Sequence, residues 1–196
     1  RNPKKTLVFS ILLFFGLTDW IVGIILIPQD YNVFRRPHPF YHHDLIPNQA
    51  ATAKWGNIEY PMFTNSLGFR DRVVRAISRK TSKKRILFIG DSFTEALGVS
   101  YEDSFVGVLD KKLKDSEVEV LNAAVVSYSP KLYYLKIQYL LEKQGLHFDH
   151  VLVFIDISDV QNELSYEQFE PLPFPIIAKL QFDLKRYLKS TSFFYY

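Results

Sequence analysis

Residues 85–95 read RILFIGDSFTE, and this stretch decides the fold. It contains a short apolar run, residues 86–89, that stops at Gly90. An apolar run of this length that ends at a glycine is typical of a buried strand in a parallel sheet. Asp91 and Ser92 follow at the carboxyl end of that strand, which is where open α/β sheets bind their ligands. The stretch therefore predicts an α/β fold with a functional site beside Ser92.

Strands and helices alternate along the rest of the chain. Apolar residues recur at helical spacing over residues 101–114 and 131–144, and again over 180–190. Between the first two helices, residues 117–121 (EVEVL) predict a second strand, and residues 151–155 (VLVFI) predict a third buried strand. This order predicts βαβ units and a parallel sheet covered by helices.

The composition excludes several kinds of chemistry. The chain has 196 residues, of which 47% are apolar, enough for one α/β domain and one extra segment. It has no cysteine, so disulfides, thiolate catalysis and cysteine-based zinc sites are excluded. The net charge of +3 and the lack of a basic stripe with interleaved aromatics argue against nucleic-acid binding. Nucleotide binding is a distant alternative because no glycine-rich phosphate loop follows a strand, and no cofactor is predicted.

An apolar segment lies near the N-terminus. Residues 6–27 are 22 consecutive residues with one ionisable side chain, Asp19. As a helix they span roughly 33 Å, enough to cross a hydrocarbon core of about 30 Å. We therefore predict one transmembrane helix in contact with membrane lipid, and a buried core helix is the alternative.

Charged residues around this segment bear on its orientation and partners. Arg1, Lys4 and Lys5 precede it, which favours a cytoplasmic N-terminus and a main domain outside the membrane, periplasmic or on the outer face. An arginine pair at 35–36 follows it and weakens that preference. Asp19 inside the span either contacts another membrane protein or lies in a locally wet or bent region.

The next segment, residues 28–84, is rich in proline, asparagine, histidine and aromatic residues. Its turn formers predict an irregular juxtamembrane segment that ends in a basic linker, residues 79–84. Aromatic residues of 34–41, together with Tyr31, are expected at the membrane interface. The predicted units are the transmembrane helix 1–27, the juxtamembrane segment and linker 28–84, and the α/β domain 85–196.

Three histidines of the juxtamembrane segment offer a metal site as an alternative. His38, His42 and His43, with Asp44, have suitable spacing only if the stretch is helical. Prolines at 37, 39 and 47 argue against a regular helix there. We therefore predict a packing role for these histidines and no metal site.

The Gly90-Asp91-Ser92 block resembles the nucleophile block of the SGNH/GDSL hydrolases. Residues 122–130 (NAAVVSYSP) are similar to the second block of that family, and residues 156–159 (DISD) to a degenerate third block. Residues 65–71 (NSLGFRD) match a segment found in a bacterial, membrane-anchored subgroup. The resemblance implies a flavodoxin-like three-layer sandwich with a parallel sheet, preceded by the transmembrane helix.

In the first two blocks, the resemblance implies that Ser92 is the catalytic nucleophile. Gly90 permits the tight turn from strand to helix, and Asp91 holds that turn by hydrogen bonds to neighbouring backbone. The backbone N–H of Ser92 is expected to donate to an oxyanion. Counted from Asn122, the glycine that gives the second oxyanion N–H in the family is Ser127 here, and a serine keeps that N–H.

The third block departs further from the family pattern of Gly-x-Asn-Asp. Ser158 occupies the place of the asparagine whose amide contacts the oxyanion, and its hydroxyl is a shorter donor. Gln161 or Asn162 is an alternative donor, and Asp159 matches the final aspartate. Loss of one oxyanion donor typically costs about 10²–10³ in turnover.

The Asp-x-x-His motif that supplies the general base in the family is absent from these 196 residues. None of the five histidines follows an aspartate by three positions, and they are His38, His42, His43, His147 and His150. The chain ends on an aromatic run, residues 193–196, which is unusual for a solvated terminus. We therefore expect the sequence to stop within the domain and the base to lie beyond Tyr196, and a pseudoenzyme is the alternative.

Together these features predict a membrane-anchored, extracytoplasmic serine esterase or O-acyltransferase that acts through Ser92. By analogy with the family, the expected substrate is an acyl ester, with O-acyl esters of cell-surface glycans as the candidate class. The alternative is a non-catalytic, SGNH-like structural subunit that docks into a membrane assembly through the Asp19 helix and the basic linker.

Overall fold

The computed structural model describes residues 3–26 and 34–171, together with residues 180, 181, 184, 187 and 188. The chain forms two compact units, one of residues Arg1–Asp30 with Ile176–Tyr196 and one of residues Tyr31–Pro175. Tyr31, most of the predicted helix 180–190 and the aromatic run 193–196 lie outside the described residues.

The N-terminal apolar segment is helical, as predicted. Helix α1 covers Pro3–Leu26, and its window Pro3–Gly23 has a mean hydropathy of 1.9. By length and composition this is the one helix of the described residues that can cross a membrane. The direction in which it crosses stays a prediction.

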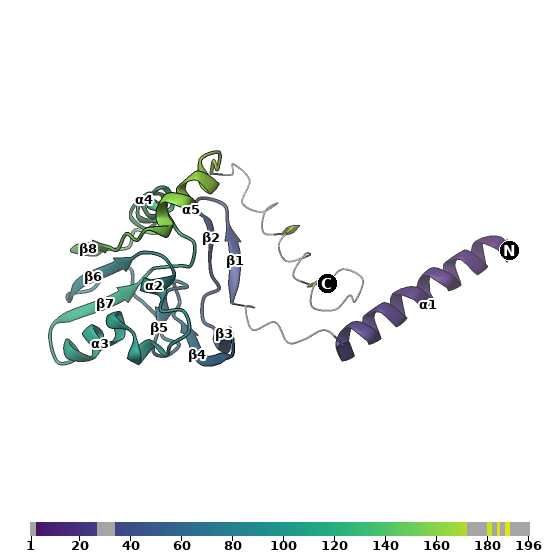
Figure 1. The fold of residues 1–196 in the computed structure, drawn as a ribbon, viewed down its shortest axis with the longest axis horizontal. Coiled ribbons are helices and arrows are strands. Elements are labelled where there is room, and N and C mark those ends of the chain that lie inside the picture. Colours follow the sequence, from purple (N-terminus) through teal and green to yellow (C-terminus); the bar gives the residue numbers. More distant parts are fainter. Residues whose placement is uncertain (1–2, 27–33, 172–179, 182–183, 185–186, 189–196) are drawn as a thin grey trace. The chain divides into compact units, whose positions relative to one another are not determined.

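The second unit is built on a six-stranded sheet with the order β3-β4-β5-β7-β6-β8 (Figure 1). Its strands are β3 Ala50–Trp55, β4 Ile58–Thr64, β5 Arg70–Asp71, β6 Lys84–Ile89, β7 Val118–Asn122 and β8 His150–Val153. The pairs β6/β7 and β6/β8 are parallel, whereas β3, β4, β5 and β7 pair in antiparallel fashion. The sheet is therefore mixed. The predicted parallel pairing is correct for the three strands after residue 84 and wrong for the sheet as a whole.

The prediction of an irregular segment over 28–84 was wrong for residues 34–71, whereas residues 72–83 contain neither helix nor strand, as predicted. Residues 35–71 contain β3, β4 and β5 and a separate antiparallel pair, β1 Arg35–His38 and β2 His42–Leu45. Prolines occur inside strands here, at Pro37 in β1 and at Pro61 in β4. Short antiparallel connections allow this segment to extend the sheet, and the predicted boundary at residue 84 runs through one compact unit.

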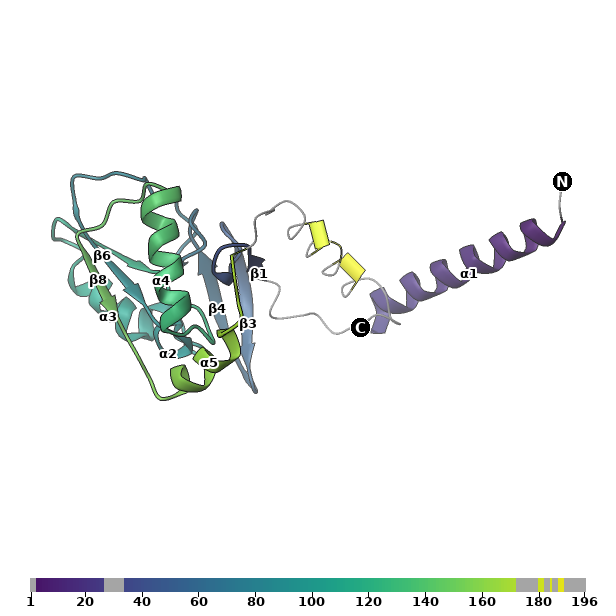
Figure 2. The same ribbon diagram turned by 90° about the horizontal axis from the view of Figure 1, so that it is seen from above.

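Helices cover both faces of the parallel part of the sheet. Helix α3 (Phe105–Lys112) packs through Val106 on Phe88 and Val120. Helix α4 (Pro130–Gln138) continues into a π-helical turn, η2 (Tyr139–Lys143), which packs through Leu140 on the opposite face. Figures 1 and 2 show α3 and α4 on opposite sides of the strands. Three shorter elements complete the unit: α2 (Ser92–Glu95), η1 (Tyr101–Asp103) and α5 (Ser158–Tyr166).

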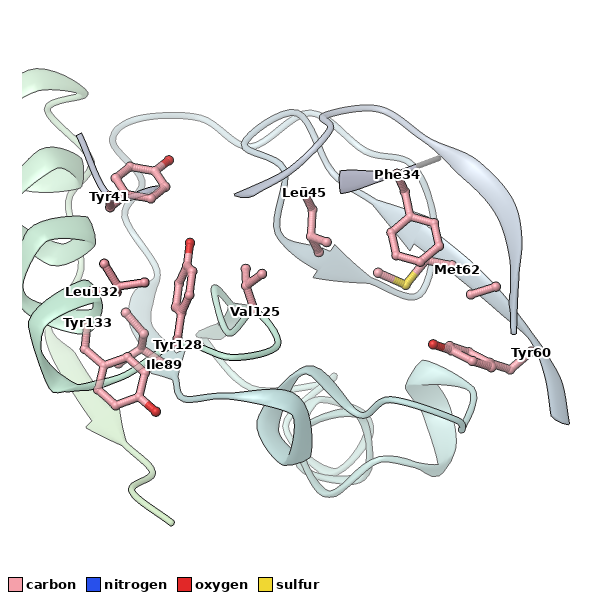
Figure 3. Close-up of a cluster of buried hydrophobic side chains, with 11 residues drawn as sticks. Phe34, Tyr41, Leu45, Tyr60, Met62, Ile89, Val125, Tyr128, Leu132 and Tyr133 are labelled. Carbon is pink, nitrogen blue, oxygen red and sulfur yellow. The ribbon is translucent and has the colours of Figure 1, made fainter. Parts of the chain in front are cut away.

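The main core joins the segment before residue 84 to the loops after β6 and β7 (Figure 3). Tyr128 is fully buried within it, beside residues from β2, β4 and α4. The labelled members of this cluster are Phe34, Tyr41, Leu45, Tyr60, Met62, Ile89, Val125, Tyr128, Leu132 and Tyr133. Because both halves of the unit contribute to it, neither half buries its apolar side chains without the other.

Strand β8 differs from the buried strand that its apolar run predicted. It pairs with β6 on one side and lies at the edge of the sheet. Leu152 is 41% exposed, Val153 46% and Phe154 39%. The run has the composition of an interior strand, but within the described residues no further strand pairs with its outer edge, and Phe105 of α3 covers only Phe154 at its end.

A buried ion pair links β2 to α4. Lys136 Nζ lies 2.8 Å from Asp44 Oδ1, and both side chains are almost completely buried. The hydroxyl of Tyr41 donates to Asp44 Oδ2 over 2.9 Å, and Lys136 Nζ donates to the hydroxyl of Tyr128 over 3.3 Å. Burial lowers the pKa of Lys136, and the neighbouring Asp44 opposes that shift.

We predict that Lys136→Met destabilises the second unit by about 3–5 kcal/mol, because it leaves the Asp44 carboxylate buried without its cation. The free energy of unfolding, measured by urea titration with circular dichroism, tests this. Lys143→Met is the matched control, since Lys143 is exposed. A loss no larger than the control's contradicts the prediction.

Candidate functional site

Ser92 lies at a sharp turn between β6 and α2. Asp91 caps the helix: its Oδ1 accepts a hydrogen bond from the N–H of Phe93 over 3.0 Å. Ser92 is partly buried, and its hydroxyl donates to Asp91 Oδ2 over 3.2 Å. The structure therefore gives Asp91 the turn-holding role that the sequence predicted, and it places the Ser92 hydroxyl against the Asp91 carboxylate.

Gly90 is required by close packing at this turn. A Cβ added to Gly90 lies 2.3 Å from Thr94 Oγ1 and 3.0 Å from the carbonyl oxygen of Phe154. The first separation is shorter than real Cβ contacts allow and the second is unusually tight, so a side chain here forces Thr94 of α2 to move. The turn is tight, as predicted. Glycine is needed at position 90 because Thr94 and the carbonyl of Phe154 approach it closely on two sides.

Loops after three parallel strands meet at this turn. The loop after β8 reaches it through Ser158, whose Oγ lies 3.3 Å from Asp91 Oδ2. The loop after β7 reaches it through the N–H of Val125, which donates to the carbonyl of Gly90 over 3.2 Å. The structure thus brings together the first and third sequence blocks directly, and the second through backbone.

Three carboxylates gather beside Ser92. Oxygens of Asp91, Asp156 and Asp159 all lie within 4.8 Å of one another. Burial raises the pKa of Asp159, which accepts two hydrogen-bond contacts of 3.0 Å from the Tyr133 hydroxyl. The hydrogen bond from Ser158 lowers the pKa of Asp156. Of the described residues these come nearest to a metal-ligand set, yet protein donors already contact every carboxylate of the group.

Both predicted oxyanion N–H groups lack a hydrogen-bond partner in the described part of the chain. One is that of Ser92, the first residue of α2, where helix N–H groups are normally unpaired. The other is that of Ser127, whereas the N–H of Val126 and of Tyr128 on either side donate to Glu95 and Val125. Ser127 has φ +61°, a backbone conformation that favours glycine. Ser127 therefore has a backbone conformation that glycine adopts freely.

The remaining predicted site residues have structural contacts. Asn122 is fully buried, and its amide donates to the carbonyl of Thr94 over 2.7 Å. Ser158 directs its hydroxyl at Asp156 Oδ1, 2.6 Å away, rather than at open space. Asn162 Nδ2 lies 3.5 Å from the carbonyl of Tyr128, whereas Gln161 is exposed. Asn162 thus contacts the second loop.

Sequence reasoning missed Glu95, which is completely buried. Its carboxylate forms a two-pronged ion pair with Arg35, at 3.0 and 2.7 Å, and accepts the N–H of Val126 over 2.6 Å. Arg70 donates to the carbonyls of Glu95, Ala96 and Val99 at the end of α2. One sequence signal pointed to this arrangement. Residues 65–71 (NSLGFRD) were singled out as a motif, and that motif contains the buried Arg70.

Asn65 and Asp71 hold that motif in shape. The Asn65 side chain accepts the N–H groups of Leu67 and Phe69 and donates to Asp71 over 3.0 Å. A Cβ on Gly68, which has φ +78°, lies 2.6 Å from the carbonyl of Leu45. The motif is a folded support for α2 in the structure.

One histidine that the sequence analysis placed outside the domain contacts the second loop. His43 Nε2 lies 2.8 Å from the carbonyl of Val126, and His43 Nδ1 lies 2.8 Å from His42 Nδ1. Burial lowers the pKa of His43 to about 4, so its ring is neutral at neutral pH. Within the described residues no imidazole hydrogen-bonds to Ser92.

Comparisons with known proteins leave the family open. A scan against protein-family models finds no match, and a search of curated proteins finds none.

Two cavities, of about 290 and about 190 Å³, are lined by residues other than Ser92.

We predict that Glu95→Gln destabilises the unit by about 2 kcal/mol, because Arg35 and the N–H of Val126 lose a charged acceptor. Glu102→Gln is the control, since Glu102 is exposed. Urea titration measures the difference, and equal stabilities of the two variants contradict the role of Glu95.

We also predict that stability falls with acid. The unfolded chain protonates histidine near pH 6.5, whereas folded His43 protonates only near pH 4, so the unfolded state binds more protons between these values. Lowering the pH from about 7 to about 5 is expected to cost about 1–2 kcal/mol through His43. His43→Gln removes this part of the pH dependence, and His147→Gln, at an exposed position, does not. Parallel pH curves for wild type and His43→Gln contradict the prediction.

Proposed function

We propose that the protein is a membrane-anchored serine esterase or O-acyltransferase of the SGNH/GDSL type, with Ser92 as nucleophile. One observation carries the proposal. A partly buried serine stands at the carboxyl end of a parallel strand and at the start of a helix, where its own N–H has no partner among the described residues, and the loop after the neighbouring parallel strand carries a second N–H without such a partner, that of Ser127. This is the arrangement that an acyl-transfer site needs.

The reaction follows from these positions. Ser92 Oγ attacks the acyl carbonyl while a general base takes its proton, and the N–H groups of Ser92 and Ser127 donate to the oxygen that becomes negative. The base returns that proton to the leaving alcohol, and water or a sugar hydroxyl then releases the acyl group from Ser92. Asp91 is the carboxylate that contacts the Ser92 hydroxyl, and Ser158 and Phe93 orient it by hydrogen bonds. The proposal requires a histidine to act as this base, and within the described residues no imidazole hydrogen-bonds to Ser92.

The anchor supports a location at a membrane. Helix α1 has the length and composition to cross it, and Arg1, Lys4 and Lys5 favour a cytoplasmic N-terminus. The domain with Ser92 then works outside the cytoplasmic membrane, where esters of surface glycans are the proposed substrates. A second membrane protein as a partner of the Asp19 region is part of the same proposal.

A non-catalytic subunit is the second candidate. The observation that favours it is that Ser92 contacts a carboxylate and no imidazole within the described residues. Serine without a base is a weak nucleophile. Under this alternative the loops around Ser92 are a structural remnant.

We predict that Ser92→Ala abolishes labelling by a fluorophosphonate and lowers p-nitrophenyl acetate hydrolysis by a factor of at least about 10³. Both assays use the full-length gene product. Ser165→Ala, an exposed serine on α5, is the control and keeps both activities. Ser127→Gly keeps the N–H in a conformation that glycine adopts freely, and therefore keeps activity. Absence of labelling in the wild type selects the non-catalytic alternative.

A further inference from the structure

A second polar region lies at the other end of the parallel strands from Ser92. A groove of about 290 Å³ opens where Lys84 of β6 pairs with Val118 of β7. Ser92 follows the opposite end of β6, which is about 20 Å away for a strand of this length. The groove therefore has its own lining and is separate from the acyl-transfer site.

Basic side chains dominate the lining of this groove. Six of them contribute, and they are Arg72, Arg75, Lys80, Lys83, Arg85 and Lys114. The acidic side chains of the lining are two, Asp110 and Glu119. The groove is positive although the whole chain carries a net charge of only +3.

The floor of the groove is already neutralised. Arg85 is buried and donates to Glu119 Oε2 over 2.8 and 2.6 Å. Arg75 donates to Glu119 Oε1 over 2.8 Å and to Asp71 over 2.7 Å. Burial raises the pKa of Glu119, but the hydrogen bonds from the two arginines outweigh it and the pKa is lowered. Arg75, Arg85, Asp71 and Glu119 thus neutralise one another. The cations on the rim are not needed as their partners.

The rim holds the charges that are available to a ligand. Arg72, Lys80, Lys83 and Lys114 are exposed, and within the described ranges none of them forms an ion pair. Asp110 is the one carboxylate of the lining outside the floor network. An anion entering the groove is thus met by an excess of unpaired cations.

The wall that carries these lysines is fixed to the sheet. The N–H of Ile77 donates to Ser66 Oγ over 2.8 Å, and Ile77 itself is buried in a core cluster. The N–H of His147 donates to the carbonyl of Arg79 over 2.9 Å. The backbone at the start of the segment predicted as a solvated linker is therefore held at Ile77 and Arg79. Lys80 and Lys83 extend from the residues that follow.

We propose that this groove binds a phosphate group. A phosphate monoester carries about −1.5 to −2 charges at pH 7 and three acceptor oxygens, which several separate donors can share. The groove volume is near the lower end of the range for small-molecule sites, about 300–1,000 Å³, and suits a head group rather than a stretch of polymer. The phosphate comes either from a free ion or from an anionic lipid headgroup.

The test is isothermal titration calorimetry of the full 196-residue chain in an uncharged detergent. Inorganic phosphate is titrated in one arm and short-chain phosphatidic acid, a lipid whose headgroup is a phosphate monoester, below its micelle concentration, in the other. Arg72→Ala with Lys114→Ala is expected to weaken binding roughly tenfold, because two of the four rim charges are lost. Lys143→Ala, an exposed lysine outside the groove, leaves binding unchanged.

The two arms identify the source of the phosphate. Binding of inorganic phosphate that is as tight as binding of the lipid assigns a free ion, and tighter binding of the lipid assigns a headgroup. No heat with either probe at millimolar concentration overturns the proposal, as does an equal loss in Lys143→Ala. Circular dichroism melting of the double variant shows whether it is folded, and Lys83→Ala is a second single-charge variant that must weaken binding in the same direction.

Discussion

The ion pair between Glu95 and Arg35 is the interaction on which the arrangement around Ser92 depends. Glu95 is the last residue of a helix of only four residues, which has little stability of its own. Its buried carboxylate holds strand β1 through Arg35 and the loop after β7 through Val126. Arg70 satisfies the carbonyls that the short helix leaves open. Contacts from three distant segments thus replace the missing helical stability.

The same logic explains why the segment before β6 is folded. It contributes Phe34, Tyr41 and Leu45 to the main core, and its charged residues contribute the partners of Glu95 and Lys136. A buried charge needs a partner in fixed geometry, so each pair also fixes the register between segments. The parallel strands set the position of Ser92, and the antiparallel extension keeps its helix there.

The sequence predicted the parts of the fold that carry a local pattern. The apolar runs of β6 and β7 and the turn at Gly90 are readable because the residues that form them are adjacent. Strands β1 and β2 read RRPH and HHDL, with neither alternation nor β-branched residues, and their burial comes from partners far along the chain. Glu95 was missed for the same reason, since Arg35 and Val126 become its neighbours only after folding. The exposure of β8 was not predicted, because an apolar run indicates a strand but does not show which elements pack against it.

Sequence separation in these pairs has a consequence for how the protein folds. Arg35 and Glu95 are 60 residues apart, His43 and Val126 are 83 apart, and Asp44 and Lys136 are 92 apart. A domain closed by such non-local contacts pays its loop-closure entropy before the contacts form, and it folds slowly. During synthesis, Arg35 and Asp44 meet their buried partners only after Glu95 and Lys136 have left the ribosome. The apolar residues Phe34, Tyr41 and Leu45 cannot complete the main core before then, so this domain is expected to depend on chaperones that hold extended chains.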